Sequence, residues 1–288
     1  MQPRTSNPPV LRLLRLWRLI WRAPALLVAA LTAWLPLLVL RPVLSRPAPR
    51  AWRAVLRTVL RCWGRTSLAI LGCRVTVRGK APRSPFLLIS NHISYLDILL
   101  LSAFTPGLFV SKAEIRGWPV AGAMCRTVGI IFVDRRRRRD VTRVGEQIAA
   151  ALADGDPVIL FPEGTSTPGN QVGPLKPSLL APAAGQELPV QWAVVRYETP
   201  PNETPAFLSV AWWGEMPLTP HAPDLLKLRR IDAEIVFGDE PVQSADRKDL
   251  ARLLRQRMAG SFRPMVSNEE LAAVGDTHGP IGIPERRG

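Results

Sequence analysis

The sequence predicts an α/β fold, with a mixed and largely buried sheet flanked by helices, behind an N-terminal membrane-associated helical segment. Strand-length apolar runs alternate with helical stretches in the later part of the chain. All of the excess positive charge lies in the first third, which also holds a long uncharged apolar run. We therefore expect a basic, apolar membrane-binding segment at 1–66, an α/β domain at 67–263 and a flexible tail at 264–288.

The charge distribution separates the membrane segment from the domain. The 288 residues include 38 Lys and Arg against 23 Asp and Glu, a formal net charge of +15. No acidic residue precedes Asp97, whereas 16 basic residues do, so residues 97–288 hold 22 basic and 23 acidic side chains. Nucleic-acid-binding domains usually spread basic residues over a folded face. A basic, apolar segment without acids is typical of attachment to an anionic bilayer, so we expect a membrane lipid and no nucleic acid as partner.

The apolar run Ala23–Leu40 is at the short end of the range of about 17–25 residues that a bilayer span needs. Pro36 lies inside this run and is expected to kink or end the helix. Arg41 and Pro42 stand where a signal peptide would have a small-residue cleavage site, which argues against cleavage. Both flanks are basic, so the positive-inside rule does not choose between a full span and a re-entrant or in-plane helix.

A second amphipathic helix is expected directly after this run. Its apolar residues recur at helical spacing and its arginines at nearly four-residue steps on the opposite face. We expect it to lie in the headgroup plane with guanidinium groups on lipid phosphates, rather than to pack on the protein's own core. The apolar positions are Trp52, Val55, Leu56, Val59, Leu60 and Trp63, and the arginines are Arg50, Arg53, Arg57, Arg61 and Arg65.

The α/β domain begins at about Leu71, where apolar runs bounded by Pro, Gly, Asp or Asn start to alternate with longer mixed stretches. Such alternation indicates a largely buried, mixed sheet. Three scattered cysteines are too few for a disulfide framework or a zinc site. The expected strands are Phe86–Ile89, Gly129–Val133, Val158–Phe161, Val190–Val195, Leu208–Trp212 and Ala233–Phe237, and the expected helices are Ile98–Ala103, Val141–Ala153 and Leu250–Met258.

The first candidate site follows the strand Phe86–Ile89, which delivers His92 to its carboxyl end, a common way to build an α/β active site. His92 and Asp97 would point about 140° apart on one helix. They meet only if His92 lies in a loop and Asp97 in the first turn of the next helix. A carboxylate there can hold the Nδ1–H of the imidazole and leave Nε2 free as a base.

Taken alone, this His-x4-Asp pattern is more often structural than catalytic. Ser94 lies close by but lacks the strained elbow of a serine nucleophile. His221 and His278 show no metal-ligand spacing, so we expect no metal site.

Two further strand ends carry polar residues. The run Val158–Phe161 leads into Pro162 and Glu163, which places a carboxylate on a turn at a strand end. The run Gly129–Val133 leads through Asp134 into five arginines, 135–139, of which the first could point into the same cleft. Each feature also fits an ordinary solvated turn or helix start.

Together these motifs resemble those of the glycerolipid acyltransferases, in particular the lysophosphatidate branch. The order is His-x4-Asp, then Gly-x-x-Phe-x-x-Arg, then Phe-Pro-Glu-Gly-Thr, and the similarity covers roughly residues 50–240. The resemblance implies that His92 is the general base and that Asp97 orients it. It also implies acceptor-binding roles: the phosphate would be held by Arg135 with Gly129 and Phe132, the glycerol hydroxyl by Glu163 with Gly164 and Thr165, and Leu188–Val190 would contribute to acyl-donor binding.

The implied reaction moves an acyl group from acyl-CoA or acyl-carrier protein, as substrate rather than cofactor, to lysophosphatidate, giving phosphatidate for phospholipid biosynthesis. Where the family usually has Arg after Glu-Gly-Thr, this chain has Ser166. The surrounding stretch resembles a subgroup that acylates lyso-ornithine lipid, which is the alternative acceptor. An alternative of another class is a non-catalytic peripheral lipid-binding protein. Because acyl thioesters are cytosolic, we expect the domain to face the cytosol from the cytoplasmic membrane.

Overall fold

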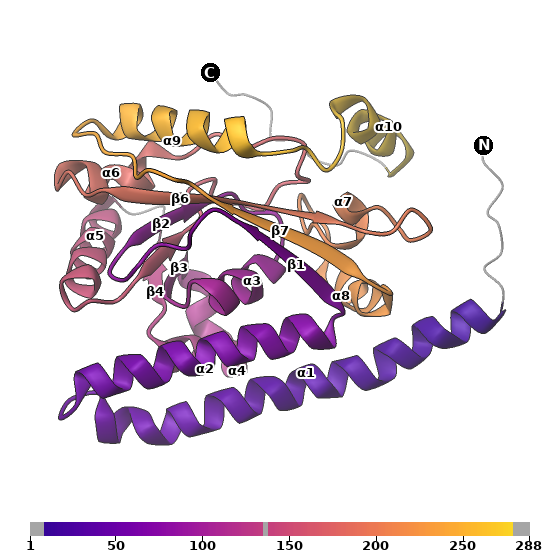
Figure 1. The fold of residues 1–288 in the computed structure, drawn as a ribbon, viewed down its shortest axis with the longest axis horizontal. Helices are drawn as coiled ribbons and strands as arrows, with labels where there is room; N and C mark the ends of the chain where they lie inside the picture. The colour runs from indigo at the N-terminus through magenta and orange to yellow at the C-terminus, as the bar shows by residue number, and fades with distance from the viewer. Residues whose placement is uncertain (1–8, 135–137, 279–288) are drawn as a thin grey trace.

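The computed structural model describes residues 9–134 and 138–278, and a seven-stranded mixed sheet forms its centre (Figure 1). The strands are β1 (Cys73–Arg78), β2 (Leu87–Ser90), β3 (Leu108–Lys112), β4 (Ile131–Val133), β5 (Val158–Leu160), β6 (Val190–Glu198) and β7 (Ile231–Phe237). Their order across the sheet is β1-β7-β6-β2-β5-β3-β4. The five strands from β6 to β4 run parallel, whereas β7 is antiparallel to β6 and carries β1 with it. The mixed α/β fold is therefore confirmed.

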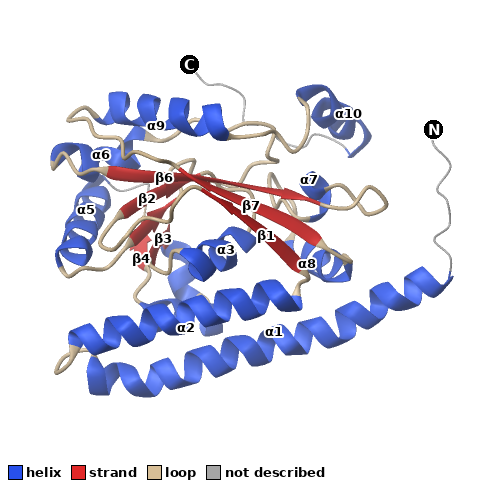
Figure 2. Cartoon of the chain, in the orientation of Figure 1, coloured by secondary structure: helices blue, strands red, loops and turns tan. Residues whose placement is uncertain are grey.

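The central strands are buried on both faces because helices cover both sides of the sheet (Figure 2). Leu88 and Ile89 of β2 are fully buried, as are Val158 and Ile159 of β5. Continuous apolar runs are what a parallel strand with two covered faces requires. The covering helices include α2 (Pro49–Ile70) and α3 (Leu96–Phe104) on one side, and α6 (Pro177–Gly185) and α9 (Arg247–Ser261) on the other; α4 (Pro119–Val128), α5 (Arg138–Ala153) and the short η1 (Ala113–Gly117) lie around β3 and β4.

The sequence-based prediction does not include β1 and β3, and it includes one strand that does not form. β1 alternates only weakly between apolar and polar residues, and β3 is short and ends in Ser-Lys, so neither has the apolar run that marks β2. The expected strand Leu208–Trp212 is wrong. Its first residues belong to the helical turn α7 (Ala206–Ser209), because Pro205 starts a turn in which Ser209 and Val210 bond back to Pro205 and Ala206.

The helix α1 (Pro9–Leu44) lies at the outer side of the molecule, along α2 (Figure 1). It contains Pro36 yet continues to Leu44, so of the two expected effects of this proline, a kink or an end of the helix, the end is wrong. A proline removes one N–H from the helix ladder, and the remaining bonds carry the helix past it. This is one helix long and apolar enough to cross a membrane, with only 11% of its most apolar window buried. Its exposed apolar side chains include Leu13, Trp17 and Val39.

The helix α2 is arranged differently from the expectation. Its predicted helical span and apolar face are correct, but that face packs inside the protein: Leu56 and Leu60 are buried against Leu37 of α1. The helix lies between α1 and α3. Arg57 donates to the carbonyl of Gly155 and to Asp156 Oδ1 at 3.1 Å. The amphipathic pattern correctly predicts that the apolar face of α2 is buried, but this face packs against α1 rather than against lipid.

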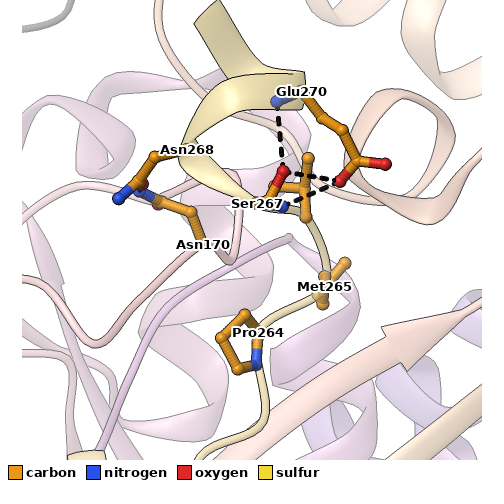
Figure 3. Close-up of a pocket in the computed structure, with 7 residues that line it drawn as sticks. Asn170, Pro264, Met265, Ser267, Asn268 and Glu270 are labelled. Atoms are coloured by element: carbon orange, nitrogen blue, oxygen red, sulfur yellow. Dashed lines mark hydrogen bonds between the residues drawn. The ribbon is translucent and has the colours of Figure 1, made fainter.

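Two short helices complete the described chain. The helix α8 (Leu218–Lys227) packs against α1. In the stretch expected to be a loose tail, the structure has the helix α10 (Asn268–His278). Ser267 and Glu270 form a reciprocal capping box at its start, and Asn170 donates to Asn268 at 2.8 Å across a hollow of about 390 Å³ (Figure 3).

Candidate active site

His92 and Asp97 meet at the carboxyl end of β2. His92 lies in the loop after the strand, and Asp97 lies in the first turn of α3. The His92 Nδ1 atom is 2.7 Å from Asp97 Oδ2. Because an ionised carboxylate only accepts hydrogen bonds, Nδ1 carries the proton and Nε2 keeps its lone pair. The placement that the spacing requires, loop for the histidine and helix start for the aspartate, is the one that forms.

The carboxylate of Asp97 is fully buried and receives four hydrogen bonds. Oδ2 accepts from His92 Nδ1, from the Ile93 N–H at 2.7 Å and from the Ser94 N–H at 3.0 Å. Oδ1 accepts from the Tyr197 hydroxyl at 2.6 Å. Backbone N–H groups and the start of a helix both favour a negative charge. The site thus holds a charged orienting group against the imidazole.

The loop that carries His92 is hydrogen-bonded to three neighbouring segments. The Asn91 amide exchanges two bonds with the backbone of Val195 in β6, at 2.8 and 3.0 Å. The Thr167 N–H donates to the His92 carbonyl at 2.9 Å, and the Trp212 N–H donates to the Ile93 carbonyl at 2.9 Å. Since backbone groups and buried side chains make these bonds, the backbone position of His92 is fixed before a substrate binds.

Glu163 reaches the same loop from the turn after β5. Its Oε2 accepts from the backbone N–H of His92 at 2.8 Å, and its Oε1 accepts from the Gly173 N–H at 2.7 Å. Burial, together with the nearby charge of Asp97, raises the pKa of Glu163 to about 7, against the opposing effect of these two bonds. Both carboxylate oxygens are occupied by backbone donors. This geometry positions the His92 backbone, so the expected contact of Glu163 with a glycerol hydroxyl stays a prediction.

The imidazole of His92 lies on the ring of Phe161, with ring centroids 4.3 Å apart and an angle of 18° between the planes. Its side chain keeps 23% of its surface exposed, so a substrate can reach it. Ser94 is fully buried, and its Oγ accepts from the Leu96 N–H at 3.3 Å, which leaves it unsuited as a nucleophile. The site therefore combines a candidate base, His92, with a carboxylate that orients it and an aromatic ring that stacks on it.

Of the residues expected to bind phosphate, Phe132 lies in β4, which is three strands from β2, with its carboxyl end at the same edge of the sheet. With a strand spacing of about 4.8 Å, that edge separates the two strand ends by about 14 Å. Gly129 ends α4 with φ at +83°, a conformation that favours glycine. The Phe132 carbonyl accepts from Arg143 at 2.8 Å. Arg135 lies outside the described residues.

Gly164 and Thr165 follow Glu163 on the same turn, where Gly164 has φ at +80° and Thr165 is exposed. The Ser166 hydroxyl donates to the Trp212 carbonyl, so this serine ties the turn to the loop after α7. Leu188–Val190 lies at the opposite edge of the sheet, because Val190 pairs with Leu87 at the start of β2. The structure therefore brings Glu163 to His92 and leaves Leu188–Val190 at the amino ends of the strands, away from His92.

Sequence reasoning missed Tyr197, Asn91 and Thr167. The expected strand Val190–Val195 ends before Tyr197, although the aromatic continues the strand pattern and could have extended it. Tyr95, inside the His-x4-Asp run, bonds His221 Nδ1 at 3.2 Å, and burial lowers the pKa of this second histidine. Among the described residues, no three of the His, Cys, Asp and Glu side chains group as metal ligands would.

Comparison with known proteins gives a consistent result. The family model described as "Acyltransferase" matches residues 74–194, which contain the His92 loop and the Glu163 turn. A lyso-ornithine lipid O-acyltransferase of Rhodobacter capsulatus is 34% identical, over 87% of this chain and 91% of its own. Another, from Rhizobium meliloti, is 32% identical over 73% of this chain and 74% of its own.

A 1-acyl-sn-glycerol-3-phosphate acyltransferase of Neisseria gonorrhoeae is 30% identical, over 73% of this chain and 82% of its own. Among solved structures, the 1-acyl-sn-glycerophosphate acyltransferase of Thermotoga maritima superposes with a TM-score of 0.60, over 85% of this chain and 95% of that one. That pair is 20% identical, so the likeness concerns the fold.

Proposed function

The chain belongs to the acyltransferase family, and within it we propose an enzyme that transfers a fatty acyl group from a thioester to the free hydroxyl of a lysolipid, with His92 as general base. The observation that carries the proposal is the His92–Asp97 pair at 2.7 Å, at the carboxyl end of a buried strand. Enzyme relatives cover most of the chain, which supports a catalyst over the lipid-binding alternative.

In this mechanism His92 Nε2 takes the proton of the acceptor hydroxyl as its oxygen attacks the thioester carbonyl. Asp97 stabilises the imidazolium that forms, because its buried charge faces Nδ1. The thiolate then leaves, and the imidazolium returns the proton to it. A positioned general base contributes about 10²–10⁴-fold to rate. Presentation of the lysolipid by the bilayer supplies positioning as well.

Transfer is direct in this proposal, without an acyl-enzyme. Ser94 is buried, and the cysteines Cys62, Cys73 and Cys125 lie on α2, β1 and α4, so none of them belongs to the His92 loop. Acyl-CoA or acyl-carrier protein serves as donor substrate, and direct transfer by a general base requires no cofactor.

Two acceptors fit the proposal, and we place lyso-ornithine lipid first. Four relatives that are 32–35% identical over 68–87% of this chain are named for that acceptor. In addition, Ser166, bonded to a carbonyl, stands where a phosphate-binding Arg is usual. Lysophosphatidate is the second candidate. The arginine run that begins at Arg135 and the Neisseria relative support it.

Membrane attachment in this proposal is through α1, with the catalytic edge facing the cytosol. The exposed apolar side chains of α1 support the attachment, and the cytosolic location of acyl thioesters supports the orientation. An in-plane helix and a span are both compatible with a single apolar helix of this length.

The central test is a single-turnover assay of His92→Ala with a labelled acyl thioester and lysolipid vesicles. We expect kcat to fall by about 10³-fold, since the base is lost while binding groups remain. His278→Ala, at the end of α10, is the control and keeps wild-type turnover. Near-normal transfer by a folded His92→Ala protein would contradict the mechanism. Lyso-ornithine lipid and lysophosphatidate offered together as acceptors then decide between the two substrates.

A further inference from the structure

A buried tyrosine completes the orienting group of the active site. Tyr197 lies in β6 with no exposed surface, and its hydroxyl donates to Asp97 Oδ1 at 2.6 Å. The other three donors to this carboxylate, including His92, all bind Oδ2. Of the donors that the described residues supply, Tyr197 is therefore the one that serves Oδ1. A charged oxygen at this depth needs such a partner.

The position of Tyr197 follows from the unequal lengths of two paired strands. β2 ends at Ser90, which pairs with Ala193, whereas β6 continues to Glu198. The extension is held on its other side by β7, where Tyr197 pairs with Ala233. Two residues earlier in β6, the N–H and the carbonyl of Val195 hold the Asn91 side chain. One rigid strand thus fixes the His92 loop both before the histidine and after it.

We propose that Tyr197 is a positioning residue that sets the basicity of His92 through Asp97. The inference rests on the proposed function, in which His92 is the base. A hydrogen bond to Oδ1 disperses the carboxylate charge and weakens its attraction for an imidazolium. His92 is then held in its orientation by Asp97 and still releases its proton readily, as a base that works near neutral pH must.

The hydroxyl remains a donor at every pH at which the enzyme works. Burial and the charge of Asp97 raise the pKa of Tyr197 well above its usual value of 10. Because Tyr197 has no exposed surface, it touches no substrate, and its influence on turnover passes through Asp97. This separates its effect from an effect on substrate binding.

Other ionisable groups face the same cluster from neighbouring elements. Glu163 bonds the His92 backbone from the β5 turn, Arg255 of α9 acts on Glu163, and Cys73 of β1 acts on Tyr197. Tyr95 lies on the loop itself and bonds His221 of α8. A change confined to the Tyr197 hydroxyl leaves all of these in place, so a shift between variants reports the Asp97 contact.

The first test is the pH profile of kcat/KM for Tyr197→Phe. We expect its acid limb to move up by about half to one pH unit and kcat to fall about tenfold, with KM for both substrates within about twofold. Tyr95→Phe is the matched control, because it removes the only other tyrosine hydroxyl of the chain and a bond to His221 rather than to Asp97. Its acid limb should coincide with that of the wild type.

The second test preserves packing. In the Tyr95→Phe background, 3-fluorotyrosine enters only at position 197, and its more acidic phenol strengthens the bond to Asp97. We expect the acid limb to move to lower pH, opposite to Tyr197→Phe. This arm decides the question if Tyr197→Phe fails to fold. A limb at the same pH in the fluorinated protein and its unlabelled parent would overturn the proposal.

A titration of the three histidines by imidazole NMR separates the two hypotheses. His92 is assigned from the loss of its signal in His92→Ala. Its protonation midpoint should move in the same directions as the acid limb, and this readout needs no turnover. If wild-type protein transfers no acyl group while the midpoint shifts, the proposed function fails and the Tyr197 coupling stands. If transfer occurs and the midpoint does not respond, the coupling fails.

Discussion

The two N-terminal helices have similar compositions and opposite surroundings. Both are rich in Leu, Trp and Arg and contain no acidic residue. On α1, Trp17 keeps 62% of its surface exposed, whereas on α2, Leu56 keeps 5%. α2 lies between α1 and α3, the helix that carries Asp97 (Figure 1). An apolar face therefore predicts burial, and the neighbour that buries it is a separate question.

This difference assigns different consequences to the two helices. A change in α2 acts on α3 and so on Asp97, the proposed orienting group of His92. Such a change should lower both the stability and kcat. A change on the outer face of α1 touches nothing in the described protein and should alter only the attachment to lipid. Equivalent substitutions in the two helices test whether this division holds.

The largest effect is expected for Gly64→Leu in α2. A Cβ at Gly64 would lie 2.6 Å from the Leu99 carbonyl oxygen and 2.7 Å from the Ala103 nitrogen, both backbone atoms of α3. Since neither can move alone, the helices must separate. We expect a loss of about 3 kcal/mol, at the upper end for overpacking, and a melting temperature lower by on the order of 10 °C.

Gly260→Leu is the matched control for this substitution. Gly260 is also helical, and a Cβ there meets nothing within 4 Å. Replacing glycine in an open helical position should add about 1 kcal/mol of stability. Thermal unfolding by circular dichroism measures both variants. Equal melting temperatures would mean that α2 does not press on α3.

The packing of α2 also shows which part of the fold could not be predicted from the sequence. Periodicity predicts the helix and its apolar positions, and the strands around His92 follow from apolar runs that only a doubly covered sheet accommodates. The choice between lipid and α1 as cover depends on how far separated segments pack. No local pattern contains that information, and the lack of acidic residues points to the wrong cover.

The candidate site divides in the same way. His92 and Asp97 are five residues apart, so the strand end and helix start fix their meeting. Tyr197 reaches Asp97 from 100 residues away, through the relative lengths of β2 and β6. Strand length is decided by pairing partners, which the sequence of one strand does not specify.

A second prediction concerns how α1 is fastened to the domain. The buried guanidinium of Arg22 donates to the carbonyls of Leu226 at 3.0 Å and Leu228 at 2.6 Å, at the end of α8. Arg22→Met leaves these acceptors without their charged donor and should lose about 2 kcal/mol. Arg15→Met, which removes the partly buried pair with Glu203 at 3.2 Å, should lose less, about 1 kcal/mol. Hydrogen exchange of the backbone amides in 218–228 measures the effect of each variant. Similar exchange rates in the two variants would contradict the expectation that Arg22 holds α1 to α8 more strongly than Arg15 does.

The smallest effect on stability is expected for Trp17→Ser on α1. The same substitution at Trp63 on α2 gives the most direct test of the difference between the two helices. Loss of the exposed indole of Trp17 should weaken partition onto anionic vesicles about tenfold, or about 1.4 kcal/mol, without changing the melting temperature. Trp63 packs on the cluster of Leu37, Leu56 and Leu60, so Trp63→Ser should lower the melting temperature and leave partition unchanged. Vesicle sedimentation and thermal unfolding are both measured on each variant. If Trp63→Ser also releases the folded protein from vesicles, α2 contacts lipid. A side chain that packs only against other residues of the protein does not change the affinity of the folded protein for vesicles.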